Sequence, residues 1–223
     1  DTQADFYGMG ETLPSIDRSR ATQHICAHRS IQNAIRAERE GYDAYLMVST
    51  PDLGFYEIRE LVDIPVVMIT ESVLHLSCLL APKFSFITHN EPLLHWLTRL
   101  AKQYGLEDRM VPGAYLNLSY QDIRNMYEKP EPYIEAFTKV AKEITGRGAN
   151  LLFPSALIVG QWCIDKGIKE VDGATVIDVL GSAIKMTELM VDLQKMGVTR
   201  SHSGAYMRPP PEVNAAIKKL YGM

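Results

Sequence analysis

The chain alternates short, almost continuously apolar runs with stretches of helical periodicity, and this alternation constrains the fold more than any other feature. Apolar runs of this kind are typical of strands that are covered on both faces. Strand–helix alternation with short connections produces a parallel sheet with right-handed crossovers. The predicted strands cover residues 43–48, 64–69, 84–88, 150–153 and 174–179, and the predicted helices cover residues 21–40, 54–62, 71–80, 91–104, 133–146, 157–166 and 181–196. The sequence therefore predicts an α/β fold, whose ligands bind beyond the carboxyl ends of the strands.

Composition narrows the classes of partner. The 223 residues carry a net charge of −4, which argues against a nucleic-acid partner, and no apolar run approaches the roughly 20 residues of a membrane span. Cys26, Cys78 and Cys163 are far apart, so we expect no disulfide framework and a cytoplasmic location. We expect all three to pack as small buried hydrophobic residues.

Two segments repeat one pattern. "REGYDAYLMVST" (residues 39–50) and "GRGANLLFPSAL" (residues 146–157) each contain a charged residue and a glycine, then an apolar strand, then a turn with a small hydroxyl-bearing residue. This repeat indicates two similar lobes, although any two strand–helix units share some of these features.

The chain resembles the aspartate/glutamate racemase superfamily, in its hydantoin/allantoin racemase branch. Four stretches carry the resemblance: "EGYDAYLMVSTPDLGFYEIRELVDIPVVMITESVLHL" (40–76), "FSFITHN" (84–90), "GANLLFPSALIVG" (148–160) and "VDGATVIDVLGSAIKMTELMVDLQKMGVTRSHSGAY" (171–206). The resemblance implies two pseudo-symmetric, doubly wound parallel-sheet lobes with the site in the cleft between them. We assign residues 1–88 and 180–223 to the first lobe and residues 89–179 to the second. Residues 5–19 resemble the end of the family's second strand, so we expect a leading strand and helix to precede Asp1.

The resemblance also implies chemistry without a cofactor, at a carbon next to a carboxylate or amide carbonyl. In the family, two cysteines from the two lobes remove and return a proton. Here the first position falls on Ser49, and the second falls on Ser155 or, without a gap, on Ala156. A thiol with a pKa of ~8.5 is a few per cent ionised at neutral pH, whereas an alkyl hydroxyl is not. A serine pair therefore predicts hydrogen bonding to developing negative charge, with another group moving the proton.

The candidates for that group lie near the same strand ends. Asp52 is a possible base or, alternatively, a turn-capping residue, and His89 is a possible base or a structural histidine. Substrate-binding roles are assigned to Thr50, Thr88, Asn90 and Ala156. His24 and His28 are four residues apart on one helix face, a spacing that metals use, but an ordinary helix surface is favoured and no metal is predicted.

Three interpretations stay open at this stage. The first is a cofactor-independent enzyme of the superfamily, acting on a small carboxylate or cyclic amide by racemisation, isomerisation, decarboxylation or hydrolysis. The second is a non-catalytic small-molecule-binding relative, and the third is a racemase whose cysteines were replaced. A homo-oligomer is expected by analogy only. A hydrolase elbow at "FPSALIVG" is disfavoured, because the glycines that flank such a serine are missing.

Overall fold

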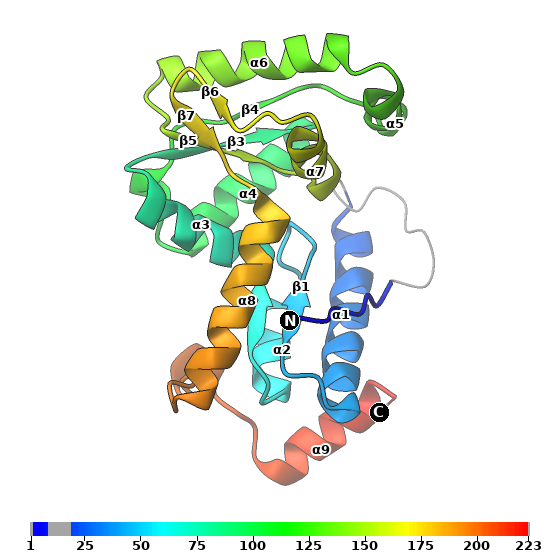
Figure 1. Ribbon diagram of the computed structural model, residues 1–223. Coiled ribbons are helices and arrows are strands. Elements are labelled where there is room, and N and C mark those ends of the chain that lie inside the picture. Colours follow the sequence, from blue (N-terminus) through cyan, green and yellow to red (C-terminus); the bar gives the residue numbers. More distant parts are fainter. Residues whose placement is uncertain (1, 9–18, 223) are drawn as a thin grey trace. The chain divides into compact units, whose positions relative to one another are not determined.

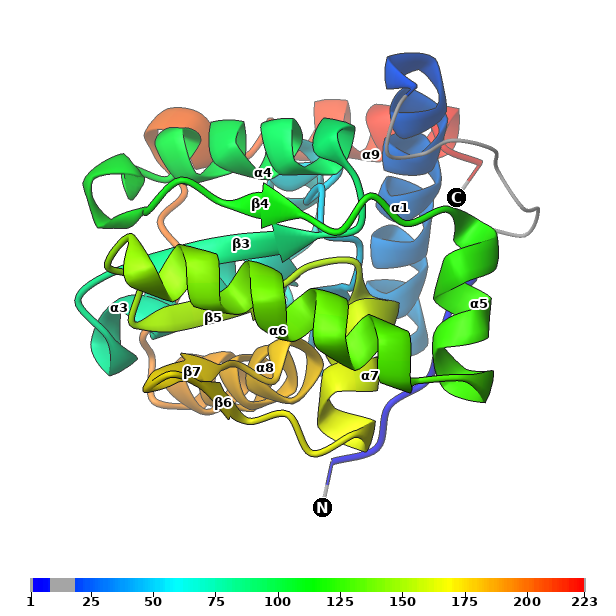
Figure 2. The ribbon, with the colours of Figure 1, turned by 90° about the horizontal axis from the view of Figure 1, so that it is seen from above.

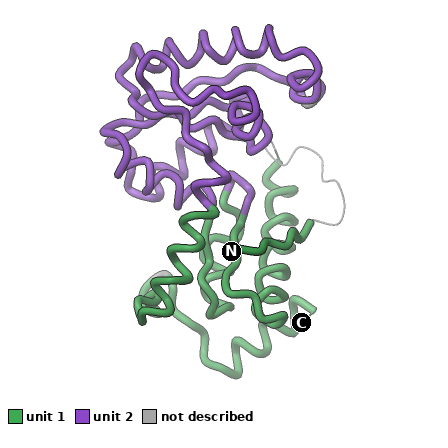
Figure 3. The backbone as a smooth tube through the Cα atoms, in the orientation of Figure 1, with its two compact units in different colours: residues 1–47, 52–68, 184–223 green, residues 48–51, 69–183 purple. Residues whose placement is uncertain are grey.

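The computed structural model describes residues 2–8 and 19–222, which form two compact units. The first unit comprises Asp1–Met47, Asp52–Met68 and Ile184–Met223, and the second comprises Val48–Pro51 and Ile69–Ala183 (Figure 3). The short segment that follows the first strand thus belongs to the second unit.

The first unit is built around two short parallel strands, β1 (Tyr45–Met47) and β2 (Val66–Met68), with Tyr45 opposite Val66 (Figure 1). Its helices are α1 (Arg20–Glu40), α2 (Phe55–Leu61), all but the first five residues of α8 (Val179–Lys195), and α9 (Pro211–Leu220), with a 3-10 turn, η2 (Gly204–Tyr206). Ser19 caps α1 by accepting from the Thr22 amide, and Gly41 ends the helix in the left-handed conformation, with φ 83°. Both ends are thus set by local sequence.

The second unit contains a five-stranded sheet in the order β4-β3-β5-β7-β6. Its strands are β3 (Phe84–Thr88), β4 (Ala114–Tyr115), β5 (Leu151–Pro154), β6 (Glu170–Val171) and β7 (Ala174–Val176). Its helices are α3 (Ile69–Leu80), α4 (Glu91–Gln103), α5 (Tyr120–Glu128), α6 (Glu131–Gly146) and α7 (Leu157–Asp165), with a 3-10 turn, η1 (Glu107–Arg109). All strand pairs are parallel except β6 with β7.

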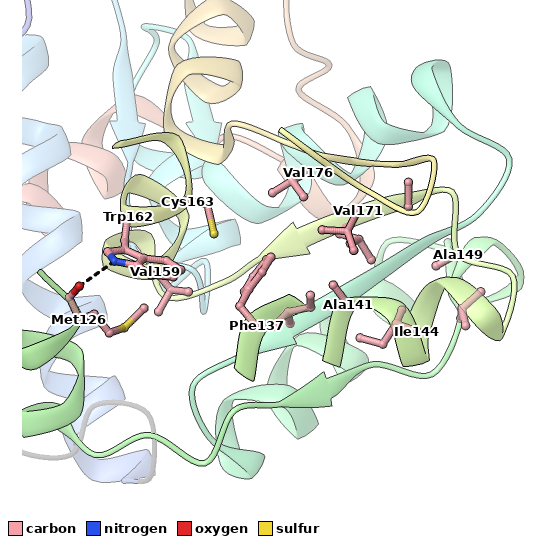
Figure 4. Packing of buried hydrophobic residues seen from close by; sticks show 14 of the residues in the cluster. Met126, Phe137, Ala141, Ile144, Ala149, Val159, Trp162, Cys163, Val171 and Val176 are labelled. Atoms are coloured by element: carbon pink, nitrogen blue, oxygen red, sulfur yellow. Dashed lines mark hydrogen bonds between the residues drawn. The ribbon is translucent and has the colours of Figure 1, made fainter. Parts of the chain in front are cut away.

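Helices cover both faces of this sheet, with α6 and α4 on opposite sides (Figures 1 and 2). On the α6 side, Phe137 and Trp162 pack edge to face in a core with Ile87 and Leu152 (Figure 4). The buried Trp162 indole N–H donates to the Met126 carbonyl of α5 at 3.0 Å, so the polar group of this side chain has a hydrogen-bond partner inside the core. On the other side, the ring of Phe86 packs edge to face against Phe84 and Phe153. Successive strand residues point to opposite faces of the sheet. Thr88, two residues after Phe86, and Ser155, two residues after Phe153, therefore lie on the α4 side as well.

The predicted α/β class with parallel-rich sheets is confirmed, and all five predicted strands form. Three parts differ from the prediction. Strand β6 is antiparallel, because a tight turn with Asp172 and Gly173 in the left-handed conformation reverses the chain. The elements β4, β6, α5 and α9 were not predicted. Cys26 and Cys163 are buried as expected, but Cys78 is only half-buried. Within the described residues, no helix is long and apolar enough to cross a membrane.

Candidate functional site

The turn after β1 is fixed by side chains from distant helices. Thr50 is buried and Ser49 half-buried. The Thr70 hydroxyl donates to the Thr50 carbonyl at 2.7 Å, and the Trp96 indole N–H donates to the Pro51 carbonyl at 3.1 Å. All of these residues lie in the second unit. The turn is therefore attached to the start of α3 and to the middle of α4.

Asp52 follows this turn and belongs to the first unit. It is buried, and its φ of 49° lies in the left-handed region, where aspartate is one of the few non-glycine residues that occur with some frequency. This backbone agrees with its predicted place in a turn. Its predicted role as a base stays a prediction.

The carboxyl end of β3 carries three buried polar residues in a row. The Thr88 hydroxyl donates to the Asn90 carbonyl at 2.7 Å. The Asn90 side-chain oxygen accepts from the Leu93 amide at 3.0 Å and so caps α4. Local hydrogen bonds therefore hold the backbone between strand and helix in one conformation.

The same cap determines which ring nitrogen of His89 accepts a hydrogen bond. Since the Asn90 side-chain oxygen is the atom that accepts from Leu93, its Nδ2 is the donor in the 2.8 Å contact with His89 Nε2. Nε2 is then an acceptor, which leaves Nδ1 as the ring nitrogen that carries a proton. The lone pair that a general base would use is already hydrogen-bonded. His89 is therefore better suited to donate a hydrogen bond than to remove a proton.

Ser155 and Ala156 follow β5, beside the end of β3. Ile87 pairs with Pro154, and the Ser155 amide donates to the Ile87 carbonyl at 2.8 Å, so Ser155 lies next to Thr88 on the same face. Ser155 is fully buried, and its Oγ has no hydrogen-bond partner among the described residues. A buried hydroxyl without a protein partner costs free energy, which a water or a ligand oxygen that accepts from it would offset.

Ala156 is the other unusual residue at this strand end. It forms the N-cap of α7 with φ 69° and ψ 112°, a backbone conformation that residues with a Cβ rarely adopt, and it offers no side-chain cap. Strain of this kind costs of order 1–3 kcal/mol and persists only where surrounding structure enforces it. The unsatisfied hydroxyl and the strained backbone are adjacent in the chain.

Cys26 and Cys163 do not supply the missing thiols. Burial raises the pKa of Cys163 to about 12 and also raises the pKa of Cys26, so neither is ionised near neutral pH.

Seven of the predicted site residues lie in the second unit: Ser49, Thr50, Thr88, His89, Asn90, Ser155 and Ala156. Apart from Ala156, these are neutral hydrogen-bonding groups, which can orient a carbonyl but cannot neutralise a full negative charge. Among the described residues, no group of three or more His, Cys, Asp or Glu could hold a metal ion, and His28 stacks on the Tyr221 ring at 4.8 Å.

Two residues of this region were not predicted from the sequence. Thr70 could have been noticed, since it follows the apolar run 64–69 just as Thr88 ends the next strand. Trp96 gives no signal in the sequence, because its partner is 45 residues away and the contact depends on how α4 packs.

These features define a class: an α/β protein with parallel strands that presents hydroxyl and amide groups at its strand ends. The chain belongs to the Asp/Glu/Hydantoin racemase family, whose sequence profile matches residues 6–153, and the predicted resemblance is thereby confirmed. It is 29% identical to a hydantoin racemase of Paenarthrobacter aurescens over 198 residues, which cover 87% of this chain and 78% of that protein. It is 28% identical to a hydantoin racemase of Pseudomonas sp. (strain NS671), over 82% of this chain and 72% of that protein.

Solved structures support the same fold. An allantoin racemase from Klebsiella pneumoniae superposes with a TM-score of 0.71 at 21% identity, covering 90% of this chain and 78% of that chain. A glutamate racemase from Bacillus anthracis gives a TM-score of 0.62 at 13% identity, covering 86% of this chain and 72% of that chain. At these identities the likeness establishes the fold alone.

Proposed function

We propose that the protein is a cofactor-independent isomerase that acts at a carbon next to the carbonyl of a small cyclic amide, with serine hydroxyls in place of the family's thiols. The single observation that carries the proposal is the buried, partnerless Oγ of Ser155 beside Thr88, among the residues that the structure describes. A hydroxyl in that state gains a hydrogen bond when a ligand oxygen reaches it, and the gain is larger in a site that excludes water.

A neutral amide ring suits the site better than a carboxylate. The residues assigned to binding in the second unit are uncharged, and an anionic substrate would need a cation to offset the loss of its hydration. The relatives named as hydantoin racemases support the same substrate class. The small-molecule partner is thus a cyclic amide of the hydantoin or allantoin type.

The reaction removes the proton from the carbon next to the carbonyl and leaves the electron pair as an enolate, whose oxygen accepts hydrogen bonds from the hydroxyls. Ser155 and Ser49 stabilise this oxygen, while Thr50, Thr88, Asn90 and the backbone at Ala156 orient the ring. Asp52 takes the proton from one face, and a proton from solvent delivered to the opposite face of the enolate completes the inversion. His89, whose Nε2 is occupied by Asn90, donates from Nδ1.

Proton exchange tests the proposal directly. We would incubate the protein with 5-substituted hydantoins, allantoin, aspartate and glutamate in heavy water and follow loss of the α-proton by NMR, against a no-protein rate. We expect exchange of the cyclic amides, lost in Ser155→Ala and in Asp52→Asn and retained in Ser85→Ala, which removes a buried serine hydroxyl from the neighbouring strand β3. Ligand binding without exchange or turnover would instead identify a non-catalytic relative, and carbon dioxide release or ring opening would identify a decarboxylase or a hydrolase.

The lobe boundaries, the cleft between lobes, the cytoplasmic location and the homo-oligomer stay predictions. Size-exclusion chromatography with light scattering decides the last of these.

A further inference from the structure

The hydroxyl-bearing turn is held through two consecutive backbone carbonyls. Thr70 donates to the carbonyl of Thr50 and Trp96 donates to the carbonyl of Pro51, at 2.7 and 3.1 Å. The donors come from positions 20 and 45 residues away in the chain. Two attachment points on adjacent peptide units fix both the position and the orientation of the peptide between them.

Both donors are themselves well supported. Thr70 is fully buried in the first turn of α3. Trp96 is half-buried in α4, and the Arg99 guanidinium lies 5.4 Å from the centre of its ring. Helix α4 starts at Glu91, immediately after the Asn90 cap, so Trp96 lies roughly 8 Å along the helix axis from that start. The helix that Asn90 begins is thus the helix that holds Pro51.

This arrangement ties separate parts of the proposed site to one support. Thr88, His89 and Asn90 stand at the start of α4, and the turn with Ser49 and Thr50 is attached further along the same helix. A change in the position of α4 relative to the turn would change the distance between the two groups of side chains. Misplacement by about 1 Å is enough to lower a reaction rate by about 100-fold.

We infer that Thr70 and Trp96 are positioning residues, which set the hydroxyls of Ser49 and Thr50 at the distance that the reaction needs. The inference rests on the proposed function for its effect on rate. Neither residue is assigned a contact with substrate.

The variants can be made nearly isosteric. Thr70→Val removes the hydroxyl, Thr70→Ser keeps it, and Trp96→Phe removes the indole N–H while keeping an aromatic ring. The matched controls are Thr98→Val, which removes a hydroxyl bonded to the Leu94 carbonyl within α4, and Trp162→Phe, which removes an indole N–H bonded to the Met126 carbonyl in the core.

Two readouts decide the inference: amide hydrogen exchange of residues 48–53, and kcat and KM for α-proton exchange of the substrate. We expect Thr70→Val and Trp96→Phe each to speed exchange at the turn and to lower kcat by about 10-fold, with the double variant lower by about 100-fold. KM should change little, any fall in melting temperature should be no larger than in Trp162→Phe, and Thr70→Ser should restore kcat. Thr98→Val should leave kcat unchanged, and Trp162→Phe should lower the melting temperature without a matching loss of kcat.

A kcat that stays at the wild-type value in both variants overturns the inference, and so does a loss of kcat that follows melting temperature in the controls as well. If the wild-type protein shows no turnover on any of the substrates, the proposed function fails separately. In that case the positioning role is decided by amide exchange alone: faster exchange confined to the Thr70 and Trp96 variants supports it, and unchanged exchange overturns it.

Discussion

Ser155→Ala should stabilise the protein while abolishing the proposed α-proton exchange. In most proteins, deletion of a buried polar group destabilises, because a hydrogen bond is lost. The Oγ of Ser155 has no partner among the described residues, so the folded state bears the cost of desolvating it without a compensating bond. That cost is about 1–3 kcal/mol for a buried, unsatisfied group. Its removal should therefore raise the free energy of unfolding by about that amount.

The matched control is Ser85→Ala on the neighbouring strand. Ser85 is also fully buried, but its Oγ donates to the Val111 carbonyl at 3.0 Å. Its removal leaves that carbonyl without the bond and should cost about 1–3 kcal/mol. For a chain of this size, each kcal/mol corresponds to roughly 2–4 °C in melting temperature, so the two variants should shift in opposite directions by several degrees.

The assay is thermal and urea unfolding followed by circular dichroism, with α-proton exchange measured on the same samples. We expect higher stability without exchange for Ser155→Ala, and lower stability with normal exchange for Ser85→Ala. If Ser155→Ala is destabilised as strongly as Ser85→Ala, its hydroxyl serves the fold, and the argument for a ligand site at this strand end fails.

Three further predictions concern charge and pH. Ser49→Cys combined with Ser155→Cys should raise α-proton exchange at least 10-fold, with a rate that increases toward the thiol pKa of ~8.5, as measured by NMR across pH. For Cys163, the folded-state pKa of about 12 lies above the reference value of 9.0, so its stabilising contribution is intact below pH 9 and declines as pH rises toward 12. At pH 11 the wild type should therefore have lost about 3 kcal/mol relative to Cys163→Ala, as measured by urea unfolding. The hydrogen bonds from Ser119 lower the pKa of Asp122. The capping box of α5 should therefore stabilise the helix at pH values above the ordinary carboxyl pKa, and this stabilisation should be lost as the pH falls through the lowered pKa of Asp122. Amide exchange of α5 should show this acid sensitivity in the wild type and not in Asp122→Asn.

The sequence predicted strand positions most accurately where a strand is buried on both faces, because such a strand must be almost continuously apolar. Residues 84–88 form β3 with the predicted bounds, because each of its residues is buried and the pattern could not fit a surface helix. Strand β4 has two residues, and it exists because it pairs with β3, a partner that its own composition does not reveal. The helices α5 and α9 had local signals that were overlooked: the Ser119–Asp122 capping box and the proline at the start of α9.

The placement of the candidate site residues was predictable to the level of strand ends and no further. Parallel topology brings Thr88 and Ser155 to the same edge, so their neighbourhood followed from periodicity. The hydrogen-bonding role of each group could not be predicted from periodicity. The acceptor role of His89 Nε2 depends on which atom of Asn90 caps α4, and the Oγ of Ser155 lacks a partner among the described residues because of the packing around it.

The combination at the end of β5 is hard to explain by folding alone. Ala156 adopts a left-handed backbone with a cost of order 1–3 kcal/mol, and the hydroxyl beside it adds a desolvation cost of similar size. Together they amount to a large fraction of the roughly 5–15 kcal/mol that stabilises a typical domain. Glycine at position 156 would relieve the first cost and alanine at position 155 the second, each by a single substitution. A chain that keeps both therefore gains something from them that the unliganded fold does not show, and a ligand oxygen that accepts from Ser155 would supply it. Under the proposed function, a hydroxyl at this position would hold the negative charge that the departing proton leaves behind and would not itself move the proton.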